Sequence, residues 1–136
     1  MNLVEMYRRY PTDEECIRYI EDIRWKGVPI CPYCHSAVTS PIPEERRHHC
    51  NTCNTTFSVT VRTLFHRTRV PLQKWFLAIS LALNPIKGVS ARELARQIHV
   101  NKDTAWSMKE RIQRAMLDDR DLVDSVAELA DRNASR

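Results

Sequence analysis

Four cysteines constrain this chain more than any other feature of its sequence. Cys31 and Cys34 are separated by two residues, as are Cys50 and Cys53, and 15 residues lie between the two pairs. This C-x2-C-x15-C-x2-C spacing is typical of a site where four thiolates hold one zinc ion, because each pair forms a tight turn that aims both sulfurs at one point. Four thiolates complete a tetrahedron without an open position, so the spacing predicts a structural and not a catalytic metal.

Other interpretations of the cysteines fit less well. Two disulfides would need an oxidising compartment, whereas the chain starts at Met1 without a charged-then-apolar leader, so we expect the cytoplasm, where thiols stay reduced. A redox C-x-x-C pair would need a βαβ pattern. Iron in the same four-thiolate geometry is the main alternative metal. Four thiolates already close the shell, so we expect His35, His48 and His49 at the surface or facing DNA and not on the metal. Cys16 has no partner at ligand spacing and is expected to be a small buried hydrophobe.

Charge is distributed unevenly along the chain. The net charge is +4 over 136 residues, but residues 1–30 carry −1, residues 31–70 carry +3, residues 71–116 carry +5 and residues 117–136 carry −3. A basic centre suits a partner that bears phosphates, because neutralising phosphates releases counterions. Charge alone does not distinguish this from a solvated surface. No apolar run approaches 18 residues, so we expect no membrane span.

A capping box predicts a helix before the first cysteine pair. Thr12 has the character of an N-cap and Glu15 that of its partner at the third helical position, while Gly27 marks the end. Apolar residues recur at helical spacing between these signals. We expect a helix over residues 13–24 that docks beside the metal site, with Trp25 packed on it.

Residues 28–66 are expected to form a small β-ribbon around the metal. Residues 46–49 should lead into the second cysteine pair as a strand, and residues 57–61 alternate and are β-branched, which favours another strand. Residues 36–43 hold two prolines and two serines and are expected to be the loop at the hairpin tip. So small a module has little core, and the metal should supply about 10 kcal/mol of its folding energy.

Three helices are predicted after the ribbon. Residues 72–83 are strongly apolar, and Asn84 followed by Pro85 ends that helix. A capping box at Ser90 starts a second helix, and a third covers residues 102–116. The residues expected on the inner faces are Trp75, Phe76, Ile79 and Leu83 on the first helix, Leu94, Ala95 and Ile98 on the second, and Ala105, Met108, Ile112, Ala115 and Met116 on the third.

The second and third helices have the pattern of a helix-turn-helix. Ala95 is small where two helices must cross closely, and Val100 supplies an apolar plug in the turn. His99 stands where glycine is usual, so either a histidine adopts positive φ or the turn differs. A plain three-helix bundle with a solvated face is the alternative. The residues expected to face base edges are Lys102, Asp103, Trp106, Ser107 and Glu110. Those expected to contact phosphates are Lys109, Arg111 and Arg114, and Arg92 is also expected to bind DNA.

The last segment is acidic but has helical spacing. Leu122, Val126, Leu129 and Ala130 recur on one side of a helix over part of residues 117–136. We expect either a linker helix or a short oligomerisation helix.

Taken together, these segments resemble the N-terminal part of zinc-ribbon transposases of bacterial insertion sequences. One departure is Arg62, where members usually carry glycine. The resemblance is carried, in this order along the chain, by residues 14–16 with Trp25, the two cysteine pairs, and residues 57–60, 63–72, 75–76 and 90–111.

The resemblance implies a small α+β protein that binds double-stranded DNA and recognises the terminal inverted repeats of a mobile element. In the family, a larger RNase H-like domain cuts and joins DNA with carboxylates that hold two metal ions. The chain ends before any such sheet, so we expect no catalytic residue and no enzyme activity here. The expected parts are a helical segment (1–27), the zinc ribbon with one zinc (28–70), the helix-turn-helix (71–116) and the acidic tail (117–136).

Two other functions stay open at this point. A free-standing regulator derived from a transposase would bind the same ends and block transposition or transcription. A zinc-ribbon module for protein interaction is less favoured, since it leaves the concentrated positive charge unexplained. Besides DNA, the partners expected are a catalytic transposase domain or a second copy bound through the tail, with the protein in the cytoplasm at the nucleoid.

Overall fold

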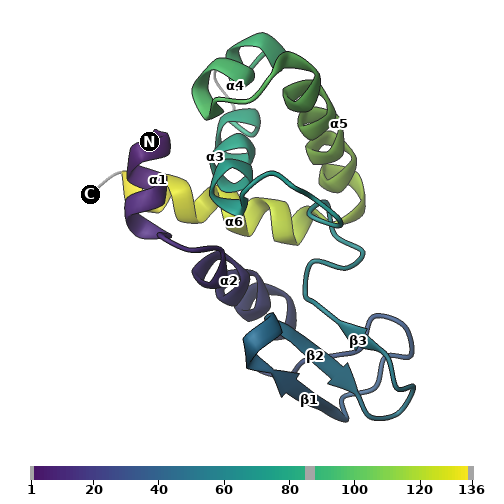
Figure 1. Cartoon of the computed structure of the whole chain (residues 1–136). Coiled ribbons are helices and arrows are strands. Elements are labelled where there is room, and N and C mark those ends of the chain that lie inside the picture. The colour runs from purple at the N-terminus through teal and green to yellow at the C-terminus, as the bar shows by residue number, and fades with distance from the viewer. Residues whose placement is uncertain (1, 85–87, 135–136) are drawn as a thin grey trace.

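The computed structural model describes residues 2–84 and 88–134, with side chains described as far as residue 128. It is a small α+β fold in which a three-stranded sheet lies at one end of the molecule and a group of helices at the other (Figure 1). The elements are α1 (Leu3–Arg9), α2 (Asp13–Trp25), β1 (Thr39–Ile42), the 3-10 helix η1 (Pro43–Glu45), β2 (Arg47–Cys50), β3 (Thr56–Phe57), α3 (Leu72–Ala82), α4 (Ala91–Ile98), α5 (Lys102–Asp118) and α6 (Arg120–Ala134).

The sheet is antiparallel in the order β1-β2-β3, with Thr39 opposite Cys50 and His48 opposite Phe57. The strand predicted before the second cysteine pair is confirmed as β2, but the predicted loop over residues 36–43 is wrong for residues 39–42, which form β1. Proline is rare in central strands because it has no backbone amide to donate to the sheet. Pro41 is tolerated here because β1 is an edge strand. The hairpin tip is η1, which ends at Arg46 with φ 54°.

The strand predicted over residues 57–61 is also wrong beyond its first residue, because β3 ends at Phe57. Hydroxyl groups direct the chain into turns at this point: the Ser58 and Thr60 hydroxyls lie 2.7 Å apart, and the Thr63 hydroxyl donates to the Thr60 carbonyl at 2.6 Å. Such local hydrogen bonds compete with a β-ladder. Val59 is consequently 1% exposed and packs in the helical core instead of the sheet.

The helix predicted over residues 13–24 is confirmed, and it extends one residue further, to Trp25. The Thr12 hydroxyl accepts a hydrogen bond from the Glu15 amide at 3.4 Å, as the capping box predicts. Helix α1 was not predicted, although Asn2 caps it by accepting from the Glu5 amide at 2.9 Å. An N-cap asparagine is the signal that sequence reasoning overlooked.

Helix α3 lies at the centre of the helical core and packs against α1, α2, α4, α5 and α6. Of its predicted stripe, Trp75, Phe76 and Ile79 are fully buried, and Leu83 is half-buried just after the helix ends. Gln73 is a buried polar residue whose Nε2 donates to the Tyr10 carbonyl at 2.8 Å, which ties α3 to the segment between α1 and α2.

The other two predicted helices are confirmed as α4 and α5, and α5 continues to Asp118. Ser90 caps α4 and Asn101 caps α5, each by accepting from the amide three residues later. His99 adopts φ 56°, so the histidine takes the left-handed conformation for which glycine is usual. Val100 packs half-buried against the core.

The acidic tail forms a helix, α6, as its spacing predicts. Leu122 and Val126 are buried against the core of the same chain, and the Tyr19 hydroxyl donates to the Ser125 carbonyl at 3.1 Å. This part of the apolar face of α6, which a self-association helix would have to expose, is therefore covered by the same chain. The side chains of Leu129 and Ala130 lie outside the described residues, as does Pro85. Among the described helices, none is long and apolar enough to cross a membrane.

Candidate metal centre and the α5 surface

The two cysteine pairs form turns of the same design. In the first, the His35 amide donates to the Cys31 carbonyl at 2.9 Å, and His35 has φ 62°. In the second, the Asn54 amide donates to the Cys50 carbonyl at 2.9 Å, and Asn54 has φ 58°. Each turn thus closes through a left-handed residue directly after its second cysteine, which points both sulfurs of the pair to one side.

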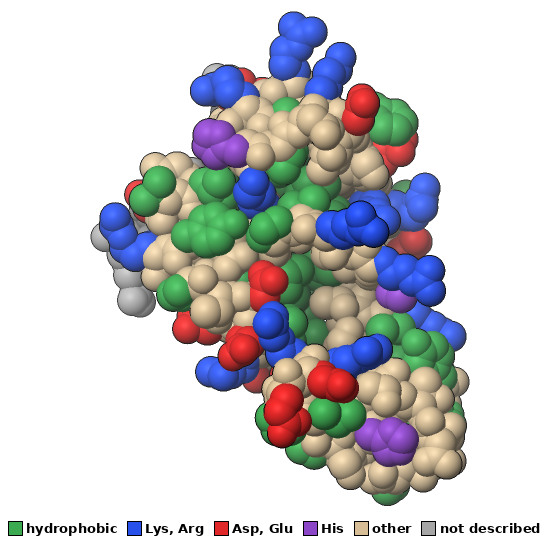
Figure 2. All heavy atoms as spheres, viewed as in Figure 1, with side chains coloured by type: hydrophobic (Ala, Val, Ile, Leu, Met, Phe, Trp, Pro, Cys, Tyr) green, Lys and Arg blue, Asp and Glu red, His purple; other side chains and the backbone are tan. Residues whose placement is uncertain are grey.

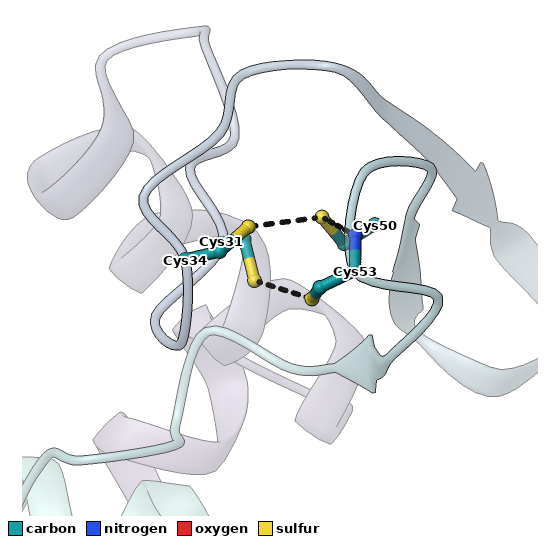
Figure 3. Close-up of side chains that lie close together, drawn as sticks. All are labelled: Cys31, Cys34, Cys50 and Cys53. Atoms are coloured by element: carbon teal, nitrogen blue, oxygen red, sulfur yellow. Dashed lines mark hydrogen bonds between the residues drawn. The ribbon is translucent and has the colours of Figure 1, made fainter.

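The four predicted ligands come together, and all their sulfurs lie within 4.8 Å of one another (Figure 3). The Sγ atoms of Cys31 and Cys53 are 3.7 Å apart, and those of Cys34 and Cys50 are 3.5 Å apart. A tetrahedral site with Zn–S bonds of 2.3 Å has sulfur–sulfur edges of about 3.8 Å. The cluster therefore fits one structural zinc ion. Bound zinc would supply the positive charge that lets four neighbouring thiolates coexist.

The sulfurs differ in how readily they ionise. The Cys53 amide donates to the Cys50 sulfur, and this outweighs burial and lowers the pKa of Cys50 to about 6. Burial raises the pKa of Cys31, but amide hydrogen bonds from Cys34 and Tyr33 outweigh it and lower that pKa. The Ser36 amide lowers the pKa of Cys34, but the Cys50 sulfur, burial and the sulfurs of Cys53 and Cys31 together outweigh it and raise this pKa to about 12. Crowded sulfurs do not all ionise without a compensating cation.

An aromatic cluster packs beside the two buried cysteines of the metal centre. The ring of Phe57 is fully buried and meets Trp25 edge to face, with centroids 5.7 Å apart. His48 stacks on Phe57 at 5.8 Å, and its Nε2 lies 2.9 Å from the Glu21 carboxylate. The expectation of a surface histidine is therefore wrong for His48, because packing and an acidic partner on α2 hold it inward. Trp25 and Glu21 join α2 to the ribbon.

The remaining histidines do not approach the sulfurs as ligands. His49 Nε2 lies 3.3 Å from the Asn54 side-chain oxygen. Over residues 2–84 and 88–128, the four cysteines are the one group of three or more side chains placed to share an ion. Cys16 is fully buried in the helical core, as predicted, and burial raises the pKa of its thiol to about 12.

Helix α5 turns its predicted recognition residues away from the core. Its inner face buries Ala105, Met108 and Ile112, while Trp106 is 56% exposed on the outer face. Lys109 is half-buried. The other predicted DNA-facing residues are all exposed: Lys102, Asp103, Ser107, Glu110, Arg111, Arg114 and, on α4, Arg92.

Arg111 has a contact that sequence reasoning missed. Its Nη1 donates to the carbonyl oxygens of Leu64 at 3.4 Å and His66 at 3.2 Å. These residues belong to the segment that joins the ribbon to α3, so Arg111 holds that segment against α5. No short-range pattern signals this pairing, because the partners are 45 residues or more apart.

Comparison with known proteins bears on the ribbon directly. Residues 11–56, which contain α2, β1, β2 and the first residue of β3, match the transposase zinc-ribbon domain family. By this match, the segment is similar to transposase zinc-ribbon domains. The resemblance predicted from the cysteine pairs is thereby confirmed for this part of the chain, and zinc is the metal that the family name gives to such a site.

A relative extends the similarity beyond the ribbon. An uncharacterized protein in the transposable element ISH50 of Halobacterium salinarum is 27% identical over 112 residues, which cover 80% of this chain. The chain spans 37% of that relative's length. No solved structure matches the chain significantly. The comparisons support a transposase-related role for a protein that carries this zinc ribbon.

Proposed function

We propose that this chain is the DNA-binding region of an insertion-sequence transposase and that it recognises the terminal inverted repeats of its element. The observation that carries the proposal is a transposase zinc ribbon braced, through α2, against a helical core that exposes a polar, basic helix. Figure 2 shows Lys and Arg side chains, with Asp and Glu side chains among them, along the edge of the molecule that α5 forms. The protein would work on DNA in the cytoplasm, at the nucleoid.

In this proposal α4 and α5 act as a helix-turn-helix, with α5 in the major groove. Its first two turns expose Lys102, Asp103, Trp106 and Ser107, which are placed to meet base edges. The three residues between the helices keep α4 and α5 close, and Lys74 Nζ donates to the His99 carbonyl at 3.0 Å, which ties the turn to α3. The turn therefore presents the start of α5 in a fixed orientation.

We assign the phosphate contacts to basic residues farther along α5 and on α4. Arg114 and Arg92 are exposed, and Lys109 is half-buried beside them. Arg111 commits Nη1 to the carbonyls of Leu64 and His66, so its Nε and Nη2 are the donors left for a phosphate. Zinc has a structural part: it holds the ribbon, and the cutting and joining of DNA belongs to a separate RNase H-like domain.

The test is a binding titration by fluorescence anisotropy with the zinc-loaded chain. One duplex carries the terminal inverted repeat of the element that encodes the protein, and the control duplex has the same bases shuffled. We expect the repeat to bind about 10³-fold more tightly or better, and both affinities to fall steeply with salt. Equal affinities would contradict recognition of the repeat. Absence of binding to either duplex would contradict DNA binding and favour the protein-interaction module.

A further inference from the structure

The segment that joins the ribbon to α3 carries charge of one sign. Residues 46–92 contain no aspartate or glutamate but include eight lysines and arginines. Within this stretch, residues 62–69 contribute Arg62, Arg67 and Arg69, all of them exposed. We call residues 62–69 the basic strap. A run without acidic residues on an exposed surface is the composition that a polyanion favours.

The basic strap is held in place from both sides. Leu64 and Phe65 are buried, and the Phe65 ring meets Trp75 edge to face at 5.7 Å. The Thr68 hydroxyl accepts a hydrogen bond from Trp75 Nε1 at 2.8 Å. Arg111 on α5 donates to two strap carbonyls, as described above. Because the strap is already ordered, its arginines would bind a ligand without the entropy cost of ordering a loop.

The strap follows α5 from its C-terminal half toward its start. One groove is lined by Arg62 and His66 of the strap together with Arg114, Asp118 and Asp119 at the end of the helix. A second groove is lined by Arg67 and Thr68 together with Asn101, Asp103 and Ser107 at the start of the helix. Arg111 lies in both grooves. Arg67 is therefore beside the residues that we assign to base edges, and the aspartates of the first groove lie at the other end.

The three strap arginines differ in what they already bind. Arg62 Nη1 donates to the Pro32 carbonyl at 2.8 Å, and its guanidinium lies 5.4 Å from the centre of the Tyr33 ring, so it links the strap to the first zinc turn. Arg67 and Arg69 form no hydrogen bond or ion pair with any residue of the described ranges. Their charges are therefore available to an external partner.

We propose that the basic strap is a second DNA-contacting element, in which Arg67 and Arg69 bind backbone phosphates of the duplex that α5 reads. The inference rests on the proposed function, because it needs α5 on DNA. Figure 2 shows Lys and Arg side chains, with a histidine among them, on the edge that runs from the helices to the ribbon. Arg62 acts as a positioning residue that keeps the strap and the zinc ribbon on the same side of the duplex.

The experiment compares the zinc-loaded full chain with the double variant Arg67→Gln/Arg69→Gln. The probe is a fluorescein-labelled 30-base-pair duplex of arbitrary sequence, titrated at several KCl concentrations. We expect the affinity to fall about tenfold and the salt slope to shrink by about 2, because each phosphate contact contributes roughly 0.9. Arg67→Lys/Arg69→Lys keeps both charges and should bind nearly as the unchanged chain does.

Controls separate charge loss from misfolding and from failure of the proposed function. Arg18→Gln removes an exposed arginine of α2 that lines neither groove, and its salt slope should not change. Far-UV circular dichroism and zinc content should match in all variants. If the double variant misfolds, Arg69→Gln alone carries the test, with a slope change of about 1. An unchanged slope in a folded strap variant overturns the inference and leaves the proposed function standing, whereas an unchanged chain that does not bind the duplex overturns both.

Discussion

At the scale of single residues, the four zinc ligands are not equivalent. Cys31 and Cys50, each the first of its pair, are fully buried and form a small core with Phe57 and Trp25, whereas Cys34 and Cys53 are exposed. The pKa values of the two buried sulfurs are also lowered, whereas the pKa of Cys34 is raised. The first cysteine of each pair therefore contributes both a metal bond and packing.

Cys31→Ser should unfold the zinc ribbon, because it removes one ligand from a site worth about 10 kcal/mol to so small a module. The measurement is zinc content by mass spectrometry together with hydrogen exchange over residues 28–60. The matched control is Cys16→Ala, which replaces a buried thiol of the helical core and should keep one zinc per chain. Native protection of the ribbon in Cys31→Ser after zinc has been lost would contradict a structural metal.

Gln73→Leu should destabilise the helical core by about 1–3 kcal/mol, because the Tyr10 carbonyl loses a buried donor. Urea unfolding followed by circular dichroism measures the change. Gln113→Leu on the exposed side of α5 makes the same chemical substitution and should stay within about 0.5 kcal/mol of the unchanged chain. Equal effects of the two substitutions would show that the Gln73–Tyr10 hydrogen bond contributes little.

At the scale of elements, the turn between α4 and α5 sets how α5 is presented. Its left-handed residue is His99, and Asn101 directly after Val100 caps α5 at 2.7 Å from the Thr104 amide. A left-handed conformation is costly for residues other than glycine. The turn therefore holds strain that a single substitution can release.

His99→Gly should stabilise the chain by about 0.5–1 kcal/mol, because the relief of left-handed strain exceeds the extra entropy of glycine in the unfolded chain. The carbonyl that binds Lys74 is kept. His99→Ala retains a Cβ at the same φ and should give no gain. Thermal and urea unfolding of both variants measure the difference, and a loss of stability in His99→Gly would show that the imidazole itself contributes.

The proposed roles along α5 separate into base readout at the start and phosphate binding farther on. Lys102→Ala should relax preference for the terminal repeat over its shuffled control, whereas Arg114→Ala should weaken both duplexes alike and reduce the salt slope by about 1. Arg114 is the cleaner phosphate variant, because Arg111 also holds the basic strap. Anisotropy titrations with both duplexes give the two ratios, and identical behaviour of both variants would contradict this division.

At the scale of the whole molecule, the chain has two cores, and α2 contacts both of them. The helical core contains Met6, Cys16 and Ile20 from α1 and α2 together with α3–α6, and the ribbon core contains Cys31, Cys50 and Phe57. Trp25 at the end of α2 packs against both. The helices thus keep most of their apolar contacts without any contribution from the metal.

Removal of zinc with a chelator should therefore unfold the ribbon and leave most helical structure in place. We expect the far-UV signal at 222 nm to fall only slightly, while hydrogen-exchange protection over residues 28–60 is lost. Zinc added back should restore that protection, and magnesium should not, because it prefers oxygen ligands. Cooperative loss of the helices on chelation would show that the two cores fold as one unit.

The sequence by itself determined the features that depend on short-range chemistry. The ligand set follows from spacing within and between two pairs, and α2, α4 and α5 begin at Thr12, Ser90 and Asn101 because a side-chain oxygen next to the first turn accepts an orphan amide. The buried stripe of α3 follows from its period. Each of these signals lies within a short stretch of sequence, so it can be recognised without knowing which distant residues pack against it.

The tertiary structure alone decided what depends on distant partners. Residues 39–42 became β1 only because β2 supplies a ladder at an edge where Pro41 is tolerated, and the apolar face of α6 folded back onto α3. The basic strap lies along α5 because Arg111 binds its carbonyls. In each case the contact energy comes from residues far apart in sequence, and local propensity does not contain it.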